Sequence, residues 1–181
     1  LVDEIAESLG DDNPPSAIIV AVGGGGLLCG VLEGLHRKGN AWKDVAVVGM
    51  ETIGADSIYQ SAEAGQLVTL PGITSVAKSL GAKTVSPKLM EWMKTHDSLT
   101  HARVSDEAAI RATACFANDN RMLVEPACGA ALAAVYEPNF LKNLVQQGKL
   151  KANLERVVVI VCGGSCVTLE YMQNWLSPIK K

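Results

Sequence analysis

The sequence has few aromatic residues, little net charge and no long hydrophobic run. Its 181 residues include three Trp, three Tyr and two Phe, and 16 basic residues against 19 acidic ones give a net charge of −3. A nucleic-acid-binding surface needs clustered positive charge, so we expect no nucleic-acid partner. The longest apolar runs, 17–22 and 157–162, are far shorter than the about 20 residues that cross a bilayer, and no signal-peptide pattern is present. We therefore expect no membrane association.

A disulfide framework and a zinc site are not expected either. The five cysteines (29, 115, 128, 162 and 166) are an odd number scattered through apolar segments, which is typical of reduced thiols in a cytoplasmic protein. Cys162 and Cys166 lack the C-x-x-C spacing of zinc ligands, and the three histidines lie far from both in the sequence.

Three uninterrupted apolar runs predict the strands of a parallel sheet. Residues 17–22, 45–50 and 157–162 are rich in valine and isoleucine and do not alternate with polar residues, as expected where helices cover both faces. The segments between them carry helix signals, so the predicted fold class is α/β, a mostly parallel sheet with helices on both faces. The chain begins at Leu1, within a helical pattern and without Met, and we therefore expect a piece of a longer protein.

Capping residues, prolines and glycines mark the ends of the expected helices. In the helix after the glycine run at 23–26, Gly30 and Gly34 lie one turn apart and are expected to let it pack closely on the sheet. The expected helices span 2–9, the stretch after 23–26, 55–64 with Gly65 as its stop, stretches that begin at Ser86-Pro87 and at Ser105, 126–136, 138–148, and 167–175 before Ser177-Pro178.

Two of the predicted strands end in glycine-rich turns. Gly23, Gly24, Gly25 and Gly26 follow the first strand, and Cys162-Gly163-Gly164-Ser165 follows the last. The carboxyl ends of parallel strands lie at one edge of a sheet, so both turns should open onto one crevice. Four glycines at the start of a helix are typical of an anion cradle, because free N–H groups and the helix dipole both favour a phosphate. The alternative is a tight structural turn without a ligand.

Nucleotide motifs fit the glycine run poorly. A P-loop needs a lysine and a hydroxyl where the sequence has Leu27-Leu28-Cys29. A Rossmann-type oxidoreductase remains an alternative, because Gly24-x-Gly26 opens the motif and Glu51 ends the next strand. However, Cys29 occupies the position of the third glycine, and Glu51 lies beyond the usual spacing of about 20 residues.

Five motifs in order carry a resemblance to a known family, and it covers nearly the whole chain. The sequence resembles the C-terminal part of the eukaryotic-type L-serine dehydratases, which also act on threonine and belong to the fold-type II enzymes that use pyridoxal 5′-phosphate (PLP). The matching segments are Val22-Gly-Gly-Gly-Gly-Leu27, Met50-Glu-Thr-Ile-Gly-Ala55, Ser75-Val-Ala-Lys-Ser-Leu-Gly81, Val124-Glu-Pro-Ala-Cys-Gly-Ala130 and Val161-Cys-Gly-Gly-Ser165.

The resemblance implies a cofactor site. Gly23, Gly24, Gly25 and Gly26 would donate to the 5′-phosphate of PLP, while Cys162, with Gly163 beside it, would face the pyridine nitrogen. A thiol is a nearly neutral donor, so the ring would be a weaker electron sink than in enzymes that place a carboxylate there. Outside this resemblance, a buried cysteine at the end of a strand is the plain alternative.

The resemblance also implies a monovalent cation, K⁺ or Na⁺, close to the phosphate loop. Glu51 would supply a carboxylate, and Ala55, Leu80 and Ala82 would supply backbone carbonyl oxygens, which suits a hard cation. The family usually has valine at position 82, a change that a backbone ligand tolerates. The alternative for Glu51 is a solvated or helix-capping carboxylate.

The implied reaction is dehydration of L-serine to pyruvate and ammonia, or of L-threonine to 2-oxobutanoate and ammonia, in a cytoplasmic homodimer of amino-acid metabolism and gluconeogenesis. Residues 1–181 would be the C-terminal portion of the large domain. The family's Schiff-base lysine and its substrate-carboxylate loop have no match here, so they would lie in an N-terminal remainder, and this chain alone would be inactive. A non-catalytic fragment is the further alternative.

Three more residues of these motifs need an interpretation. We interpret Lys78 as a structural or surface residue and not as the Schiff-base lysine. Glu125 either stabilises the helix after it through the helix dipole or shapes the crevice. Cys166 stands where related enzymes usually have Asn, which makes the hydrogen bonding near the ring nitrogen a point of difference.

Overall fold

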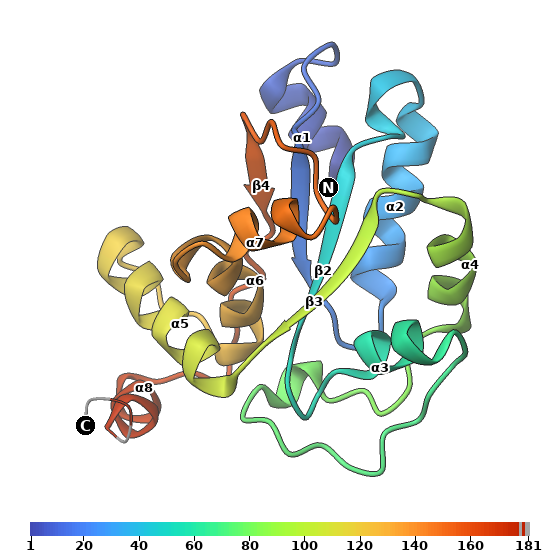
Figure 1. Cartoon of the computed structure of the whole chain (residues 1–181). Helices are drawn as coiled ribbons and strands as arrows, with labels where there is room; N and C mark the ends of the chain where they lie inside the picture. The colour runs from blue at the N-terminus through green and yellow to red at the C-terminus, as the bar shows by residue number, and fades with distance from the viewer. Residues whose placement is uncertain (178, 180–181) are drawn as a thin grey trace.

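The structure is a parallel sheet between two layers of helices (Figure 1). The computed structural model describes residues 1–177 and 179. The strands are β1 (Ala17–Ala21), β2 (Ala46–Thr52), β3 (Leu99–Val104) and β4 (Val157–Val159), in the order β3-β2-β1-β4 and all parallel. The helices are α1 (Val2–Leu9), α2 (Gly26–Lys38), α3 (Ser57–Ala64), α4 (Pro87–Thr95), α5 (Asp106–Asn120), α6 (Pro126–Tyr136), α7 (Phe140–Gln146) and α8 (Leu169–Leu176), with short 3₁₀ turns η1 (Asn40–Trp42) and η2 (Lys78–Leu80).

The α/β prediction is confirmed, with two corrections to the strands. Strands β1 and β2 are buried along their whole length, as their unbroken apolar sequences predict. Strand β4 is only half-buried and ends at Val159, short of Cys162, because it pairs with β1 alone within the described residues. Strand β3 was not predicted, because its alternation of buried and half-buried residues gives no continuous apolar run.

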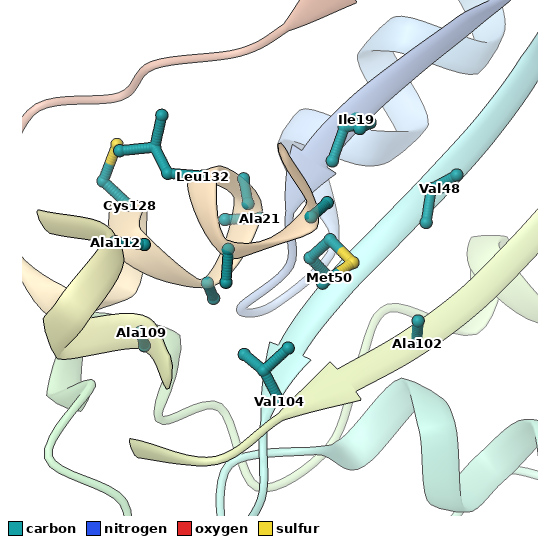
Figure 2. Close-up of a cluster of buried hydrophobic side chains, with 14 of the residues drawn as sticks. Ile19, Ala21, Val48, Met50, Ala102, Val104, Ala109, Ala112, Cys128 and Leu132 are labelled. Atoms are coloured by element: carbon teal, nitrogen blue, oxygen red, sulfur yellow. The ribbon is translucent and has the colours of Figure 1, made fainter. Parts of the chain in front are cut away.

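Successive residues of the central strands face opposite helix layers. Ile19 and Ala21 point into a core shared with α5, α6 and α7, part of which is drawn in Figure 2. Ile18 and Val20 point the other way, into a core shared with α1, α2 and α4. Both faces of β1 are therefore buried against helices. This packing fixes the position of the carboxyl end of β1 and of the loop that follows it.

Most predicted helix ends are confirmed by their caps. Ser86 Oγ accepts from Lys88 N at 3.3 Å, Ser105 Oγ accepts from Ala108 N at 3.2 Å, and Gly65 has a left-handed φ of 65° after α3. The start at Pro138 is wrong, because Asn139 is left-handed and α7 begins at Phe140. The last helix begins at Leu169, two residues later than expected, and Pro178 lies outside the described residues.

The glycines of α2 do not bring that helix close to the sheet, contrary to the expectation. Gly30 is exposed and a Cβ there would meet nothing within 4 Å, whereas Gly34 faces Val2 of α1. The close approach occurs at Gly129 in α6, where a Cβ would overlap Ala109 O and lie 2.7 Å from Thr113 Cγ2. Glycine is therefore required where α5 and α6 pack. No helix among the described residues has the length and apolar character that a membrane span requires.

These two glycines make a matched pair of variants. Gly129→Ala should lower the free energy of unfolding by about 1–3 kcal/mol, because the methyl group has no space against α5. Gly30→Ala should raise it by about 0.5–1 kcal/mol, because alanine favours an exposed helix position. Urea denaturation measures both values, and equal effects of the two substitutions would contradict the packing described for α5 and α6.

Candidate functional site

A crevice lies beyond the carboxyl end of β1 and brings both glycine-rich turns together. It encloses about 250 Å³ and is lined by the glycine loop and by Cys162, as the predicted shared edge requires. Gly163, which the resemblance places beside the cofactor ring, is not among the lining residues, and its carbonyl oxygen accepts from Glu125 N at 3.1 Å. The remaining lining residues are Ala21, Leu27, Leu28, Ser79, Leu80, Glu125, Ala127 and Cys128.

The glycine loop presents unpaired backbone donors to this crevice. Gly25, with φ 90°, is the N-cap of α2, and no side chain caps the helix. Within the described residues, none of the N–H groups of Gly23, Gly24, Gly25 or Gly26 donates to a protein acceptor. A Cβ at Gly26 would meet nothing within 4 Å, so the space before the helix is open. This combination of free N–H groups, positive helix dipole and open space is an anion cradle.

The segment from Ser75 to Ser86 fixes the position of the glycine loop. Ser86 N donates to Gly24 O at 2.9 Å, and a Cβ at Gly23 would lie 3.1 Å from Ser79 O. Ser75 Oγ hydrogen-bonds to Thr52 Oγ1 at 2.7 Å and to Asp106 Oδ1 at 2.5 Å. Hydrogen bonds thus connect the cradle to β2 and to the start of α5.

The turn after β4 places a thiol in the crevice. Cys162 is exposed, and Gly163 and Gly164 have φ values of 81° and 136°, which favour glycine. Partial desolvation of the thiol by the surrounding crevice, followed by the charge of Glu125, raises the pKa of Cys162. Cys128 lies on the α6 side, and burial raises its pKa although backbone hydrogen bonds from Gly163 and Cys162 oppose that change. A protonated Cys162 is a weak hydrogen-bond donor.

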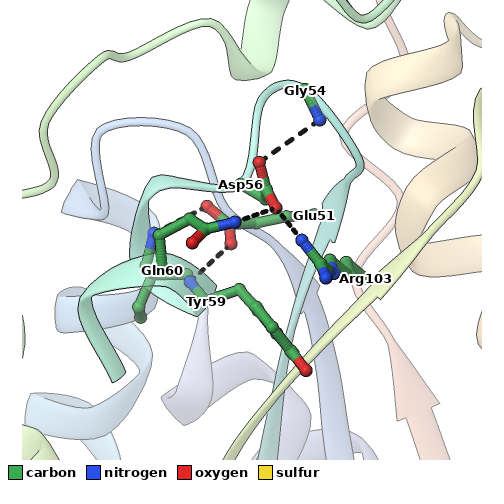
Figure 3. Close-up of polar contacts among 7 residues, drawn as sticks. Glu51, Gly54, Asp56, Tyr59, Gln60 and Arg103 are labelled. Atoms are coloured by element: carbon green, nitrogen blue, oxygen red, sulfur yellow. Dashed lines mark hydrogen bonds and ion pairs between the residues drawn. The ribbon is translucent and has the colours of Figure 1, made fainter. Parts of the chain in front are cut away.

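Glu51 is fully buried and caps a helix (Figure 3). Its Oε1 accepts from Ile58 N at 3.0 Å and its Oε2 from Tyr59 N at 2.8 Å, in the first turn of α3. Even so, burial raises the pKa of Glu51 to about 8, since desolvation outweighs these two hydrogen bonds. Asp56 nearby pairs with Arg103.

The residues expected around a cation lie on two adjoining segments. Thr74 N donates to Gly54 O at 3.0 Å, which ties the segment of Glu51 and Ala55 to the one that leads to Leu80 and Ala82. Leu80 lines the crevice, and Ala82 lies 3.9 Å from the place of a Cβ on Gly24.

Sequence reasoning missed Ser57 beside this group. Its Oγ is buried and has no hydrogen-bond partner among the described residues. The described residues contain no group of three or more His, Cys, Asp or Glu side chains that could hold a metal ion, so any ion here needs backbone and hydroxyl oxygens besides Glu51. The sequence carries no signal for this hydroxyl, because the lack of a hydrogen-bond partner arises only from packing.

A second cavity of about 330 Å³ adjoins the crevice and shares Ser79, Glu125 and Ala127 with it. Lys78 is exposed and lines this second cavity, not the crevice itself, as does Cys166. The position of Lys78 agrees with its interpretation as a surface residue.

A parallel α/β sheet with a phosphate cradle and a thiol at one strand edge defines the class as a cofactor-binding α/β domain. Comparison with protein families identifies one family over most of the chain. Residues 1–163 match the family described as "Pyridoxal-phosphate dependent enzyme", and the chain belongs to this family.

Individual relatives are similar over nearly the whole chain. The L-serine dehydratase/L-threonine deaminase of Bos taurus is 52% identical over 169 residues, which are 93% of this chain and 50% of that protein. A serine dehydratase-like protein of Rattus norvegicus is 52% identical over 174 residues, 96% of this chain and 51% of its own length. The crystal structure of a fungal L-serine ammonia-lyase from Rhizomucor miehei superposes with a TM-score of 0.86 at 39% identity, over 97% of this chain and 53% of that one. The chain thus spans about half the length of these relatives.

The buried carboxyl of Glu51 predicts a pH-dependent stability. Its pKa in the folded state, about 8, lies above the ordinary value of 4.5, so the folded state binds more protons between these limits. The stability is then greatest below about pH 4.5 and is lost as the pH rises toward 8. In a buffer whose only added cation is tetramethylammonium, Glu51→Gln should remove this part of the pH dependence. Urea unfolding at pH 6 and pH 8 measures the change in the free energy of unfolding between these two pH values. An equal change in the parent protein and in the Glu51→Gln variant would contradict the assignment to Glu51.

Proposed function

We propose that the protein containing this chain dehydrates L-serine to pyruvate and ammonia, and L-threonine to 2-oxobutanoate and ammonia, with PLP as cofactor. One observation carries the proposal. The free N–H groups of the glycine loop and the Cys162 thiol line a single crevice in a chain of the pyridoxal-phosphate family. The names of the bovine and fungal relatives support the substrate and the reaction.

The residues present fit the phosphate end of PLP. The N–H groups of Gly23, Gly24, Gly25 and Gly26 would hold the 5′-phosphate, because they have no protein acceptor among the described residues and α2 directs its positive end at them. Side chains larger than glycine would obstruct part of this loop. A Cβ on Gly25, whose φ is 90°, would overlap Leu89.

At the ring end, Cys162 and Gly163 would lie against the pyridine nitrogen. PLP, when bound, draws electrons from the substrate's α-carbon, and the strength of that effect depends on the proton at the ring nitrogen. A thiol that remains protonated holds the nitrogen through a weak hydrogen bond and does not bring a negative charge to it. Cys162 would therefore favour prompt loss of the β-hydroxyl over side reactions at the α-carbon.

The described residues supply no lysine to the crevice and no group that would grip the substrate carboxylate. We propose that both come from an N-terminal remainder of the same protein, which would include the small domain, and that residues 1–181 are the C-terminal portion of the large domain. The complete protein would be a cytoplasmic homodimer whose pyruvate enters gluconeogenesis. The half-length match to the relatives and the five free cysteines support this arrangement.

We also propose a monovalent cation, K⁺ or Na⁺, bound by Glu51 and by the carbonyl oxygens of Ala55, Leu80 and Ala82. The buried Ser57 hydroxyl without a partner and the raised pKa of Glu51 support it, because a cation would satisfy the hydroxyl oxygen and balance the carboxylate charge.

A Rossmann-type oxidoreductase is not favoured. In such an enzyme Glu51 would accept hydrogen bonds from the ribose of the nucleotide. Here the Glu51 side chain is fully buried, and both carboxylate oxygens already accept from backbone N–H groups at the N-terminus of α3. Titration of the complete protein with NADH and with PLP separates the two functions directly.

A charge placed in the cradle tests the phosphate site. Gly26→Asp should weaken PLP binding to the complete protein at least about tenfold, because the carboxylate occupies the open space and repels the phosphate. An aspartate at the first position of α2 suits the helix dipole, so folding should be preserved. Gly30→Asp adds the same charge one turn later on the exposed side of α2 and should leave binding unchanged. Equal affinities of both variants, measured by absorbance titration, would count against the cradle.

This chain alone should bind PLP poorly and form no pyruvate from L-serine, because the Schiff-base lysine lies outside it. The visible absorption band of the lysine-bound cofactor and a pyruvate assay provide the measurement. A saturable band together with pyruvate formation by this chain would refute the proposed division of the active site.

Replacement of tetramethylammonium by K⁺ should raise the melting temperature of the protein at neutral pH. A site that binds only the folded state contributes about 2.7 kcal/mol at an ion concentration 100 times its Kd. Glu51→Gln should abolish the increase, while Glu63→Gln, an exposed glutamate on α3, should keep it. An increase of the same size in the Glu51→Gln variant would refute the site.

A further inference from the structure

Glu125 is the one charged side chain among the described residues that line the glycine-loop crevice, and the proposed reaction gives it no task. It occupies the N-cap position of α6 but makes no capping hydrogen bond with its side chain. The described residues provide no hydrogen bond or ion pair to its carboxylate. Its position at the N-terminus of α6 agrees with the expected effect on the helix dipole, but a capping hydrogen bond does not account for a half-buried acid in this crevice.

The contacts of Glu125 are with the turn that follows Cys162. Its backbone N–H donates to Gly163 O at 3.1 Å. Its side chain packs over Gly164, where a Cβ would lie 2.5 Å from Glu125 Cγ and 2.7 Å from Cδ. The two glycines have φ values of 81° and 136°, so the turn bends around this side chain in a way that other residues rarely adopt.

We propose that Glu125 is the positioning residue for Cys162: it holds the turn that presents the thiol, and it places a negative charge on the crevice that the thiol lines. A hydrogen bond from the Cys162 thiol to the pyridine nitrogen of PLP rests on the proposed function. The control of the thiol by Glu125 is a property of this chain by itself.

The electrostatic surroundings support this assignment. Deprotonation of Cys162 would place a thiolate beside the Glu125 carboxylate in a partly desolvated crevice, where like charges repel strongly. The other titratable group in the crevice is Cys128, and Lys78, Cys166 and Tyr171 line the adjoining cavity that shares Glu125. Of these side chains only Lys78 carries a positive charge, and it is exposed to solvent. The raised pKa of the Cys162 thiol, from burial and then from Glu125, agrees with this balance.

The test is the pH profile of Cys162 alkylation by iodoacetamide in the cofactor-free protein, followed by peptide mass spectrometry. Glu125→Gln keeps the backbone hydrogen bond and the shape of the side chain but removes the charge. We expect Cys162 to react about threefold faster at pH 8, because removal of the neighbouring negative charge lowers the pKa of the thiol and so increases the fraction of thiolate. Glu125→Ala should also accelerate it, whereas Glu125→Asp, which keeps the charge, should retain the parent profile.

Two other thiols serve as references in the same samples. Exposed Cys115 on α5 should react equally in every variant, and buried Cys128 should stay unreactive while the fold is intact. An unchanged Cys162 profile in both neutral variants would overturn the proposal, as would equal acceleration by Asp and Gln. The readout needs no PLP, so its failure is distinct from a failure of the proposed function, which the cofactor titration tests.

Discussion

Parallel pairing of β1 with β2 on one side and with β4 on the other is the constraint on which the site depends. The register places Ala21 opposite Met50, while β4 runs alongside the first part of β1 and its chain then continues to Cys162. Because all three strands run in the same direction, the glycine loop, the Glu51 segment and the Cys162 turn leave the sheet at one edge. Residues more than a hundred positions apart in the chain therefore meet around one crevice.

Sheet geometry brings these loops together but does not fix their conformations. That role belongs to polar contacts from the segment between α3 and α4. Ser75 connects Thr52 to Asp106, and Ser86 N holds Gly24 O. These hydrogen bonds are buried or partly buried, so the loss of a partner would leave an unsatisfied polar group. The backbone donors of the cradle are thereby held apart from protein acceptors and remain free for an anion, which is a preorganised arrangement.

The sequence allowed the fold class, three of the four strands and most helices to be predicted, because unbroken apolar runs and capping residues are local signals. Strand β3 was not predicted, because its residues alternate between buried and half-buried and give no continuous apolar run. Strand β4 was predicted too long, because its apolar run continues past the last pairing residue, Val159. The meeting of the glycine loop and the Cys162 turn at one crevice was predicted because turns at the carboxyl ends of parallel strands share an edge, whereas the role of Cys162 was implied only by the family resemblance. Ser57 was not recognised, because an unsatisfied hydroxyl is a property of three-dimensional packing and has no sequence signature. The same is true of the contact between Glu125 and Gly164.

Glu51 and Glu125 differ in burial and in their contacts at this edge of the sheet. Glu51 is enclosed by β2 and α3, and two backbone N–H groups do not compensate for its lost hydration, so the folded protein favours its protonated form near neutral pH. A bound cation would reverse that preference, since it compensates the charge that burial opposes. Glu125 is only half-buried and keeps contact with water, so its charge acts outward, on the neighbouring thiol. Glu51 thus needs a partner of opposite charge, whereas Glu125 disfavours a second negative charge at Cys162, and the difference in burial between the two side chains contributes to this contrast.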